Sequence, residues 1–355
     1  MTDANGAASE PTPVGDTQQE ALKRDDAGFY HDPPLWVGSS PVDHASQSAN
    51  FPAFRETVFD KALSNRIALK VTREGLFAFT FSSWEPGRLP PDSPGAPMDF
   101  EKQASAILNR TLVMNAFLAF FYTNEHRLSQ FERDRMVVTP ELVISMHGDG
   151  MGFGTQRVSQ LVLSSYESTY RPQVPAIFDD RIMFRGKPVP LEVVAKTADD
   201  LDQLLASDTS DGLLLADLFL RSSKSYQDHN HSFALIINWT ITEKLIQELW
   251  QVYQRDNKDR DGRRFITKER AKRLDDGRTF TAAVITEMLS FAQYISAELY
   301  ADICIVRKKR NDWIHSLVSG ISSDDARKAA DVSSRLLQQV RGIELEGRRG
   351  LQIHG

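Results

Sequence analysis

The chain has 355 residues, of which 41% are apolar and 25% are charged, as in a soluble globular protein long enough for two domains. A single cysteine, Cys304, excludes an intramolecular disulfide, and the most apolar run, Leu112 to Tyr122, is too short to cross a bilayer. The first residues lack the apolar core of a signal peptide. We therefore expect a cytoplasmic protein without a membrane partner.

The net charge of −6 originates in the first 50 residues, which hold eight acidic and two basic side chains. The remaining chain holds 40 of each, so a nucleic-acid partner is not excluded, although a broad basic face is disfavoured. Residues 1–50 are rich in Asp, Ser, Pro, Gly and Ala, with few apolar residues before Phe29. We predict a disordered acidic tail there, within which Phe29 to Trp36 is a candidate docking element.

Residues 51–205 have the composition of an α+β domain, whose role the sequence does not reveal. Alternating apolar residues on both sides of "REG" predict a β-hairpin over Arg66 to Ser83. A loop rich in Pro and Gly follows, and then helical spacing with Asp99 as a candidate N-cap. Short strands are predicted for the runs "MVVT", "ELVISMHG", "RIMF" and "LEVVAKT".

Residues 211–345 show apolar residues at helical spacing and predict an all-α, up-and-down helical bundle, with a tail at 346–355. A loop at 258–278, with nine basic and five acidic residues, interrupts the pattern. Such a loop is more often simply solvated, but it could hold an RNA backbone if RNA binds. The predicted helices cover 213–226, 231–255, 280–295, 296–318 and 322–346.

The fourth predicted helix contains "IVRKKRNDWIHSLVSG", Ile305 to Gly320. At about 3.6 residues per turn, Arg310 occupies a position on the apolar stripe that runs from Leu299 to Leu317. Asn311 and His315 are neighbours on the adjoining face, because they are four residues apart. We expect the three polar side chains to converge at the margin between core and surface.

These residue types suit a phosphate site with a proton donor or acceptor. The guanidinium of Arg310 offers a permanently charged fork of donors, and His315 is suited to proton transfer near neutral pH. Asn311 can orient the imidazole or bind a phosphate oxygen. No carboxylate or cysteine cluster nearby suggests a metal or another cofactor. The set fits metal-independent RNA cleavage, in which a 2′-hydroxyl attacks the adjacent phosphate.

A purely structural interpretation of the motif stays open, because an arginine followed five residues later by a histidine is common. Arg310 can cap or pair with a neighbouring helix, and His315 can be a polar residue in the last turn before Gly320.

The segment Arg310 to His315, "RNDWIH", resembles the arginine, polar residue and histidine signature of the HEPN superfamily, of the Apea-like or Abi-like type. The resemblance covers about residues 211–345 and implies a helical bundle that forms a homodimer with one composite ribonuclease site. It implies catalysis by Arg310, Asn311 and His315, with Glu243 on an early helix as a further candidate. Arg307, Lys308 and Lys309 add positive charge for binding RNA.

The function that the resemblance implies is a metal-independent endoribonuclease that acts as a toxin or anti-phage defence effector. An antitoxin or regulatory protein is then a further expected partner. The alternative is a non-catalytic helical module that dimerises or binds a partner.

Two other motifs favour structural interpretations. The glycines of "HGDGMGFG" (His147 to Gly154) match no phosphate-binding fingerprint and indicate a connection or sharp turn. His229 and His231 lie at an expected helix start and lack further metal ligands at fitting spacing.

Overall fold

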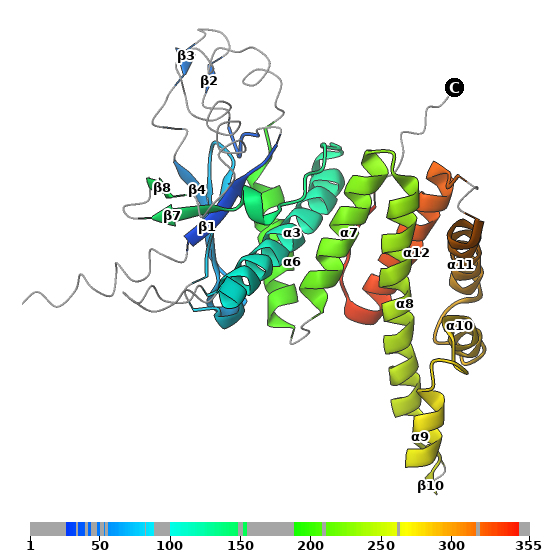
Figure 1. The fold of residues 1–355 in the computed structure, drawn as a ribbon. Coiled ribbons are helices and arrows are strands. Elements are labelled where there is room, and N and C mark those ends of the chain that lie inside the picture. Colours follow the sequence, from blue (N-terminus) through cyan, green and yellow to red (C-terminus); the bar gives the residue numbers. More distant parts are fainter. Residues whose placement is uncertain are drawn as a thin grey trace, which may run out of the picture.

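The computed structural model describes residues 26–32, 35–39, 42–43, 48–49, 53, 56–81, 83–88, 100–147, 152–154, 188–207, 211–260, 263–316 and 320–347. It combines a small antiparallel sheet near the N-terminus with a larger helical part (Figure 1). The predicted layout, α+β followed by helices, is therefore confirmed.

The sheet has six strands in the order β4-β5-β6-β1-β7-β8, and every neighbouring pair is antiparallel. Its strands are β1 (Asp26–Tyr30), β4 (Thr57–Ala62), β5 (Ala68–Thr72), β6 (Leu76–Thr80), β7 (Ile144–His147) and β8 (Gly152–Gly154). Two short strands, β2 (Val42–Asp43) and β3 (Ser48–Ala49), pair separately.

Strand β1 corrects the predicted N-terminal tail. It lies inside the sheet, with Phe29 opposite Phe77 of β6 and Gly28 opposite Ile144 of β7. Ala27 and Phe29 are fully buried. Residues 26–32 therefore belong to the folded unit, and the part of the predicted tail before Asp26 lies outside the described residues.

The predicted hairpin is confirmed as β5 and β6. Gly75 adopts a φ of +80° in the turn, and a Cβ there would lie 2.7 Å from the carbonyl oxygen of Leu35, so both conformation and space require glycine. The glycine-rich motif is also a hairpin, β7 with β8, whose turn at 148–151 lies outside the described residues.

The described helices are α3 (Phe100–Ser129), α6 (Leu191–Ala206), α7 (Gly212–Gln227), α8 (His231–Asp256), α9 (Lys268–Leu274), α10 (Ala282–Phe291), α11 (Ala297–Ser316) and α12 (Ser323–Arg341). Of these, α3 and α6 pack against the sheet. The 3-10 turns are Ser64–Arg66, Glu85–Gly87 and Pro140–Leu142.

Two strand predictions are wrong. "LEVVAKT" forms the start of α6, and "MVVT" at 136–139 is irregular backbone. "RIMF" lies outside the described residues. The predicted loop at 258–278 also has structure, because it contains α9 and a ribbon of β9 (Asp259–Arg260) and β10 (Arg263–Arg264).

Helix α3 is the central element of the core. Phe117 packs against the rings of Phe77 and Phe79, with centroids 5.1 and 5.8 Å apart. By length and composition α3 is the one helix among those described that could cross a membrane, but 67% of its apolar window is buried inside the protein. That burial is typical of the core helix of a soluble protein.

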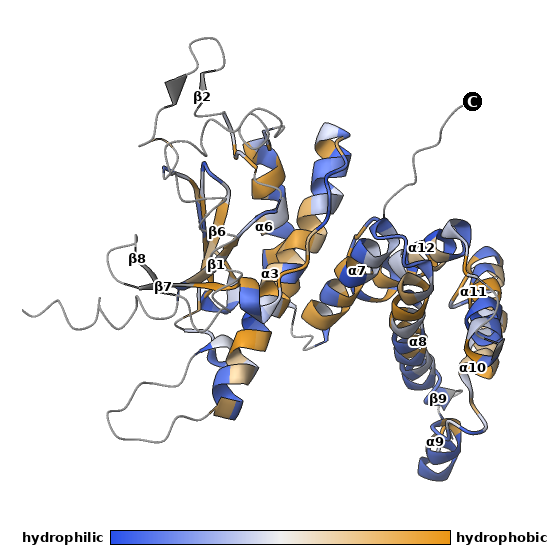
Figure 2. Cartoon of the chain, turned by 45° about the horizontal axis from the view of Figure 1, so that its top comes forward, coloured by the Kyte–Doolittle hydropathy of each residue, from blue (hydrophilic) through white to orange (hydrophobic). Residues whose placement is uncertain are grey.

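The sheet unit and the helical part share one core. The far side of α3 packs on α7, and fully buried Asn115 of α3 donates to Asp217 Oδ1 of α7 at 2.6 Å. Hydrophobic residues line α3 and α7 in Figure 2. The predicted boundary near residue 211 therefore separates two groups of elements but not two separate cores.

Helices α7, α8 and α12 form the centre of the helical part, with a buried network in which Asn238 bonds Ser222 and Ser333. Helix α12 begins with a capping box of Ser322 and Asp325. Helix α11 packs on α12 and α8 at the outer edge (Figure 1). It is tied to α12 through Asp302, which accepts from Lys328 and Arg335.

Candidate functional site

The motif occupies the last two turns of α11, at the outer edge of the helical part. The apolar stripe that leads to it is buried as predicted, with Leu299, Ile303 and Val306 inside the core. Arg310 and Trp313 continue the stripe but are only half-buried. The stripe thus leaves the core at Arg310, which places the guanidinium at the margin between core and solvent.

Arg310 is held by its neighbour in the chain. Its Nη1 donates to Oδ1 of Asn311 at 3.0 Å. Within the described chain no carboxylate lies within ion-pair distance of this guanidinium. Arginines of comparable burial elsewhere do have such partners, since Arg335 pairs with Asp302 at 3.0 Å and Arg341 with Glu248 at 2.7 Å. Arg310 is therefore a positive group with room for an external anion.

His315 is exposed on the same helix, one turn beyond Asn311. No hydrogen bond joins Asn311 and His315 in the described structure. A separation of five residues places Arg310 and His315 about 140° apart around the helix axis, since each residue turns about 100°. The structure therefore joins Arg310 and Asn311 by a hydrogen bond, while His315 starts from another side of the helix and bonds neither of them among the described contacts.

The basic residues before the motif have different surroundings. Arg307 is half-buried and Lys308 is exposed, and neither makes an ion pair with a described carboxylate. Lys309 Nζ lies 3.3 Å from Oδ1 of Asp325 and connects α11 to the start of α12. Lys309 thus has a structural role that the sequence did not indicate, which leaves Arg307 and Lys308 as the freer candidates for phosphate.

Glu243 is exposed on α8, away from the motif. On α12, Ser333 bonds Asn238 and Arg341 bonds Glu248, so Glu243 lies level with the C-terminal half of α12. The motif lies at the other end, where Lys309 meets Asp325. The eight residues from 325 to 333 alone span about 12 Å. The structure does not bring Glu243 to Arg310 within one chain.

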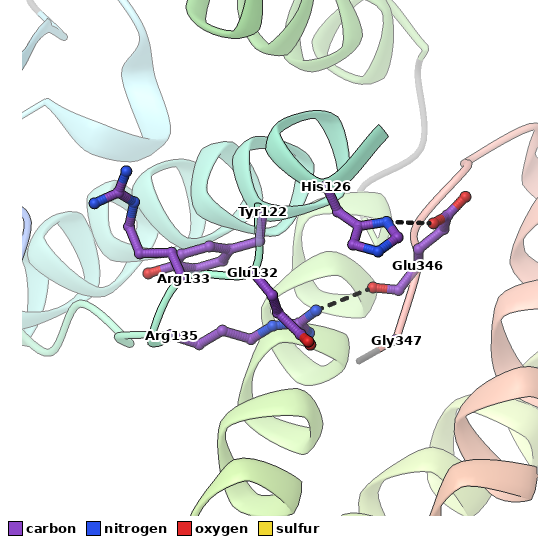
Figure 3. A pocket seen from close by; sticks show the side chains of 7 residues that line it. All are labelled: Tyr122, His126, Glu132, Arg133, Arg135, Glu346 and Gly347. Carbon is purple, nitrogen blue, oxygen red and sulfur yellow. Dashed lines mark hydrogen bonds and ion pairs between the residues drawn. The ribbon is translucent and has the colours of Figure 1, made fainter. Parts of the chain in front are cut away.

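A small polar cavity of about 10 Å³ lies between α3 and the segment after α12, with room for about one water molecule (Figure 3). His126 Nδ1 lies 3.5 Å from a carboxylate oxygen of Glu346, and Arg135 donates to the Glu346 carbonyl. The neighbouring Arg127 pairs with Glu346 at 2.8 Å. The cluster fastens the C-terminal segment to α3 and is too small for a substrate.

The cavity wall includes Tyr122, whose hydroxyl accepts from the backbone N–H of Met136 and contacts His31 Nε2, both at 2.8 Å. Burial raises the pKa of Tyr122 well above its ordinary value. Because its neutral hydroxyl makes two hydrogen-bond contacts, Tyr122 fixes the loop that follows α3.

A wider, open groove of about 750 Å³ lies between the α10–α11 turn and α12. Its polar lining consists of amides and hydroxyls such as Gln293, Gln338 and Ser296, and its charged member, Arg335, is bonded to Asp302. It offers no group for proton transfer near neutral pH. Among the described residues, no cluster of histidine, cysteine and acidic side chains fits a metal ion.

Comparisons with protein-family models, with curated proteins and with solved structures gave no match for this chain. The candidate site therefore rests on its own chemistry and geometry.

Proposed function

We propose that the chain is a metal-independent endoribonuclease of the HEPN type, as the motif resemblance implies. The observation that supports it best is Arg310, a half-buried guanidinium at the surface end of α11 that bonds an amide and no described carboxylate. A half-buried cation costs desolvation free energy unless an anion compensates it. A phosphate of bound RNA is such an anion and fits the guanidinium fork.

In this proposal the 2′-hydroxyl of the RNA attacks the adjacent phosphate. A 2′,3′-cyclic phosphate forms as the bond from phosphorus to the 5′-oxygen breaks. His315 takes the proton of the 2′-hydroxyl and delivers it to the leaving 5′-oxygen, and Arg310 stabilises the charge that develops on the phosphate oxygens. Asn311 holds the guanidinium in place. Arg307 and Lys308 bind neighbouring phosphates. Because Arg310 and His315 point in different directions within one chain, two copies of α11 supply the complete site.

The cellular setting of this proposal is a cytoplasmic toxin or anti-phage defence effector. Such an enzyme must be restrained, so an antitoxin or regulatory partner belongs to the proposal. The sheet unit, which shares a core with the helical part, is a suitable place for that control.

The test compares RNA cleavage by wild type, Arg310→Ala and His315→Ala. We expect each variant to lose cleavage by roughly 100-fold or more, because general acid–base and charge stabilisation each contribute that much. Wild-type cleavage should persist in EDTA and leave 2′,3′-cyclic phosphate ends. Arg255→Ala is a matched control, because Arg255 is 73% exposed on α8. Equal cleavage in all four proteins, or loss of wild-type cleavage in EDTA, would refute the proposal.

A second candidate is a non-catalytic module that dimerises or binds a partner through the outer helices. Large apolar side chains are exposed on α10 and α11, among them Phe291 at 81%, Ile305 and Ile314. A dimer by light scattering together with no cleavage of RNA by wild type would favour this candidate.

A further inference from the structure

A basic arm projects from the end of α8. It comprises the described residues 258–260 and 263–278, which contain the β9–β10 ribbon and α9. In Figure 1 α9 and β10 extend beyond the other helices, and in Figure 2 α9 is hydrophilic over most of its length. The arm lies apart from the candidate catalytic motif, and the proposed reaction does not use it.

The arm is anchored to the protein at both ends. Where the arm begins, the backbone N–H of Lys258 donates to the carbonyl of Arg255 on α8 at 3.2 Å, and within the arm the N–H of buried Ile266 donates to the carbonyl of Lys258 at 3.0 Å. At the other end, Trp250 Nε1 donates to the carbonyl of Leu274 at 3.1 Å, and Phe280 stacks on the Trp250 ring. These contacts hold the arm in one position, which a solvated loop does not need.

Three acidic side chains of the arm accept hydrogen bonds from uncharged groups and not from its basic side chains. Asp275 accepts from Gln254, Asp276 accepts from Thr279, and Glu269 accepts from Thr267. None of the arm's described basic side chains makes an ion pair with a described carboxylate. Those that are exposed are Lys258, Arg263, Arg264, Lys268, Arg270, Lys272, Arg273 and Arg278. The positive charge of the arm is therefore available to an external polyanion.

The ribbon presents two consecutive arginines. Arg263 and Arg264 of β10 are both exposed, and the backbone of β10 pairs with β9 so that Arg264 is opposite Asp259. Neither arginine makes an ion pair with a carboxylate in the described part of the chain. A phosphate of a bound nucleic acid would be a fitting partner, because the guanidinium fork matches its oxygens.

An aromatic platform lies beside these arginines. Phe265 follows Arg264 directly and is 39% exposed, and the guanidinium carbon of Arg270 lies 4.1 Å from its ring centroid. Aromatic rings between basic side chains are the means by which proteins bind single-stranded nucleic acid, because any base can stack on them. The combination distinguishes the arm from a merely charged surface.

We propose that the arm binds single-stranded RNA, with Arg263 and Arg264 on its phosphates and Phe265 beneath a base. This inference rests on the proposed ribonuclease function and names a second contact for its substrate. Tyr294, just before α11, donates to Asp256 at the end of α8. The start of α11 is therefore near the base of the arm, and the motif lies toward the other end of α11. The 13 residues from 297 to 310 span about 20 Å, or roughly six phosphates at 3.4 Å each.

The binding experiment uses the full chain with His315→Ala, so that cleavage does not interfere. A fluorescent single-stranded RNA of about 20 nucleotides is titrated at several salt concentrations, and duplex DNA of the same sequence is the second probe. The arm variant is Arg263→Gln with Arg264→Gln. The matched control is Lys70→Gln with Arg88→Gln, which removes two positive charges that are 58% and 56% exposed on the sheet unit.

Each phosphate contact to a single strand contributes about 0.7 to the slope of log affinity against log salt concentration. Relative to 1 M salt, one such contact therefore raises the affinity roughly fivefold at about 0.1 M salt. We therefore expect the arm variant to bind RNA about 25-fold more weakly, with a slope smaller by about 1.4, and the control to change less than twofold. Phe265→Ala should weaken RNA binding at least fivefold and leave binding to duplex DNA unchanged, since stacking requires an unpaired base.

The inference is overturned if the arm variant and the control bind RNA alike, or if Phe265→Ala weakens RNA and duplex DNA equally. Circular dichroism of each variant confirms that it is folded. Cleavage distinguishes the two proposals. If the arm variants lose RNA binding but wild type cleaves no RNA, only the ribonuclease proposal is refuted. If wild type cleaves long RNA and the arm variants cleave it equally well, only the arm proposal is refuted.

Discussion

Replacing Asn115 by alanine tests whether the sheet unit and the helical part unfold together. Asn115 lies on α3 and makes three buried hydrogen bonds: its Nδ2 donates to Asp217 Oδ1 and to the carbonyl of Val138, and its Oδ1 accepts from the Val138 N–H. The lengths are 2.6, 2.9 and 2.7 Å. The substitution therefore leaves three buried polar groups without this partner, one of them on α7.

The expected cost follows from these groups. A buried donor or acceptor that loses its partner costs about 1–3 kcal/mol, and Asp217 keeps its bond from Arg221. The two groups of Val138 that lose their partner therefore cost about 2–6 kcal/mol in total, a large part of the roughly 5–15 kcal/mol by which domains are stable. For a chain of this size, at about 2 °C per kcal/mol, the melting temperature should fall by roughly 4–12 °C.

The assay is urea unfolding followed by circular dichroism and by tryptophan fluorescence. Both parts of the chain carry tryptophans, for example Trp84 near the sheet and Trp250 on α8. We expect both probes to shift together, because α3 and α7 share one core. Asn109→Ala is the matched control on the same helix, since its hydrogen bond to Pro86 lies at the surface and water replaces it. Equal stability of the two variants, or separate transitions for the two probes, would show that the shared core does not couple the parts.

Two further predictions concern α11 and α12. The hydrogen bond from Lys328 lowers the pKa of Asp302 below its ordinary 3.8, so this carboxylate stabilises the fold above that pH and loses its effect as the pH falls through the lowered pKa. Asp302→Asn should therefore lower the free energy of unfolding at pH 7, and the difference should disappear at acid pH; a difference that persists there would contradict the reasoning. Ser322→Ala removes the capping box and should cost about 1 kcal/mol in urea unfolding, whereas Ser323→Ala, one residue into the helix, should cost less.

The helices were predicted well because their apolar residues repeat at helical spacing over long stretches. The segment 191–197 alone is too short to distinguish a strand from a buried helix. Extended to Leu205, its buried residues Val193, Val194, Ala198 and Leu201 follow the helical period. Strand β1 was missed for another reason. It is a short, buried strand in a polar surrounding, and its stability comes from pairing with β6 and β7, far away in the sequence.

The candidate site shows the same division between local and distant information. The exit of the stripe from the core depends on one helix and is expected from the helical period. The sequence also predicts that His315 converges with Arg310 and Asn311, but only the latter two are joined by a hydrogen bond in the described structure. The ion pair of Lys309 with Asp325 and the separation of Glu243 from the motif depend on how α8, α11 and α12 pack. A single sequence contains little information on that packing, so residues on other helices were the least predictable part of the site.

The geometry of α11 ties the proposed chemistry to assembly. A proton-transfer group and a charge-stabilising group must both reach one phosphate within hydrogen-bond distance. Arg310 and His315 face about 140° apart, and Glu243 is at another level of the helical part, so one chain presents the guanidinium without a proton-transfer partner. Helix α11 lies at the outer edge, and Ile305 and Ile314 are exposed on it. In the proposed homodimer a second copy packs on that edge, covers these apolar residues and brings its own His315 toward the first Arg310. In the proposed enzyme, therefore, the contact that stabilises the dimer also completes the site, and dilution to monomers switches cleavage off.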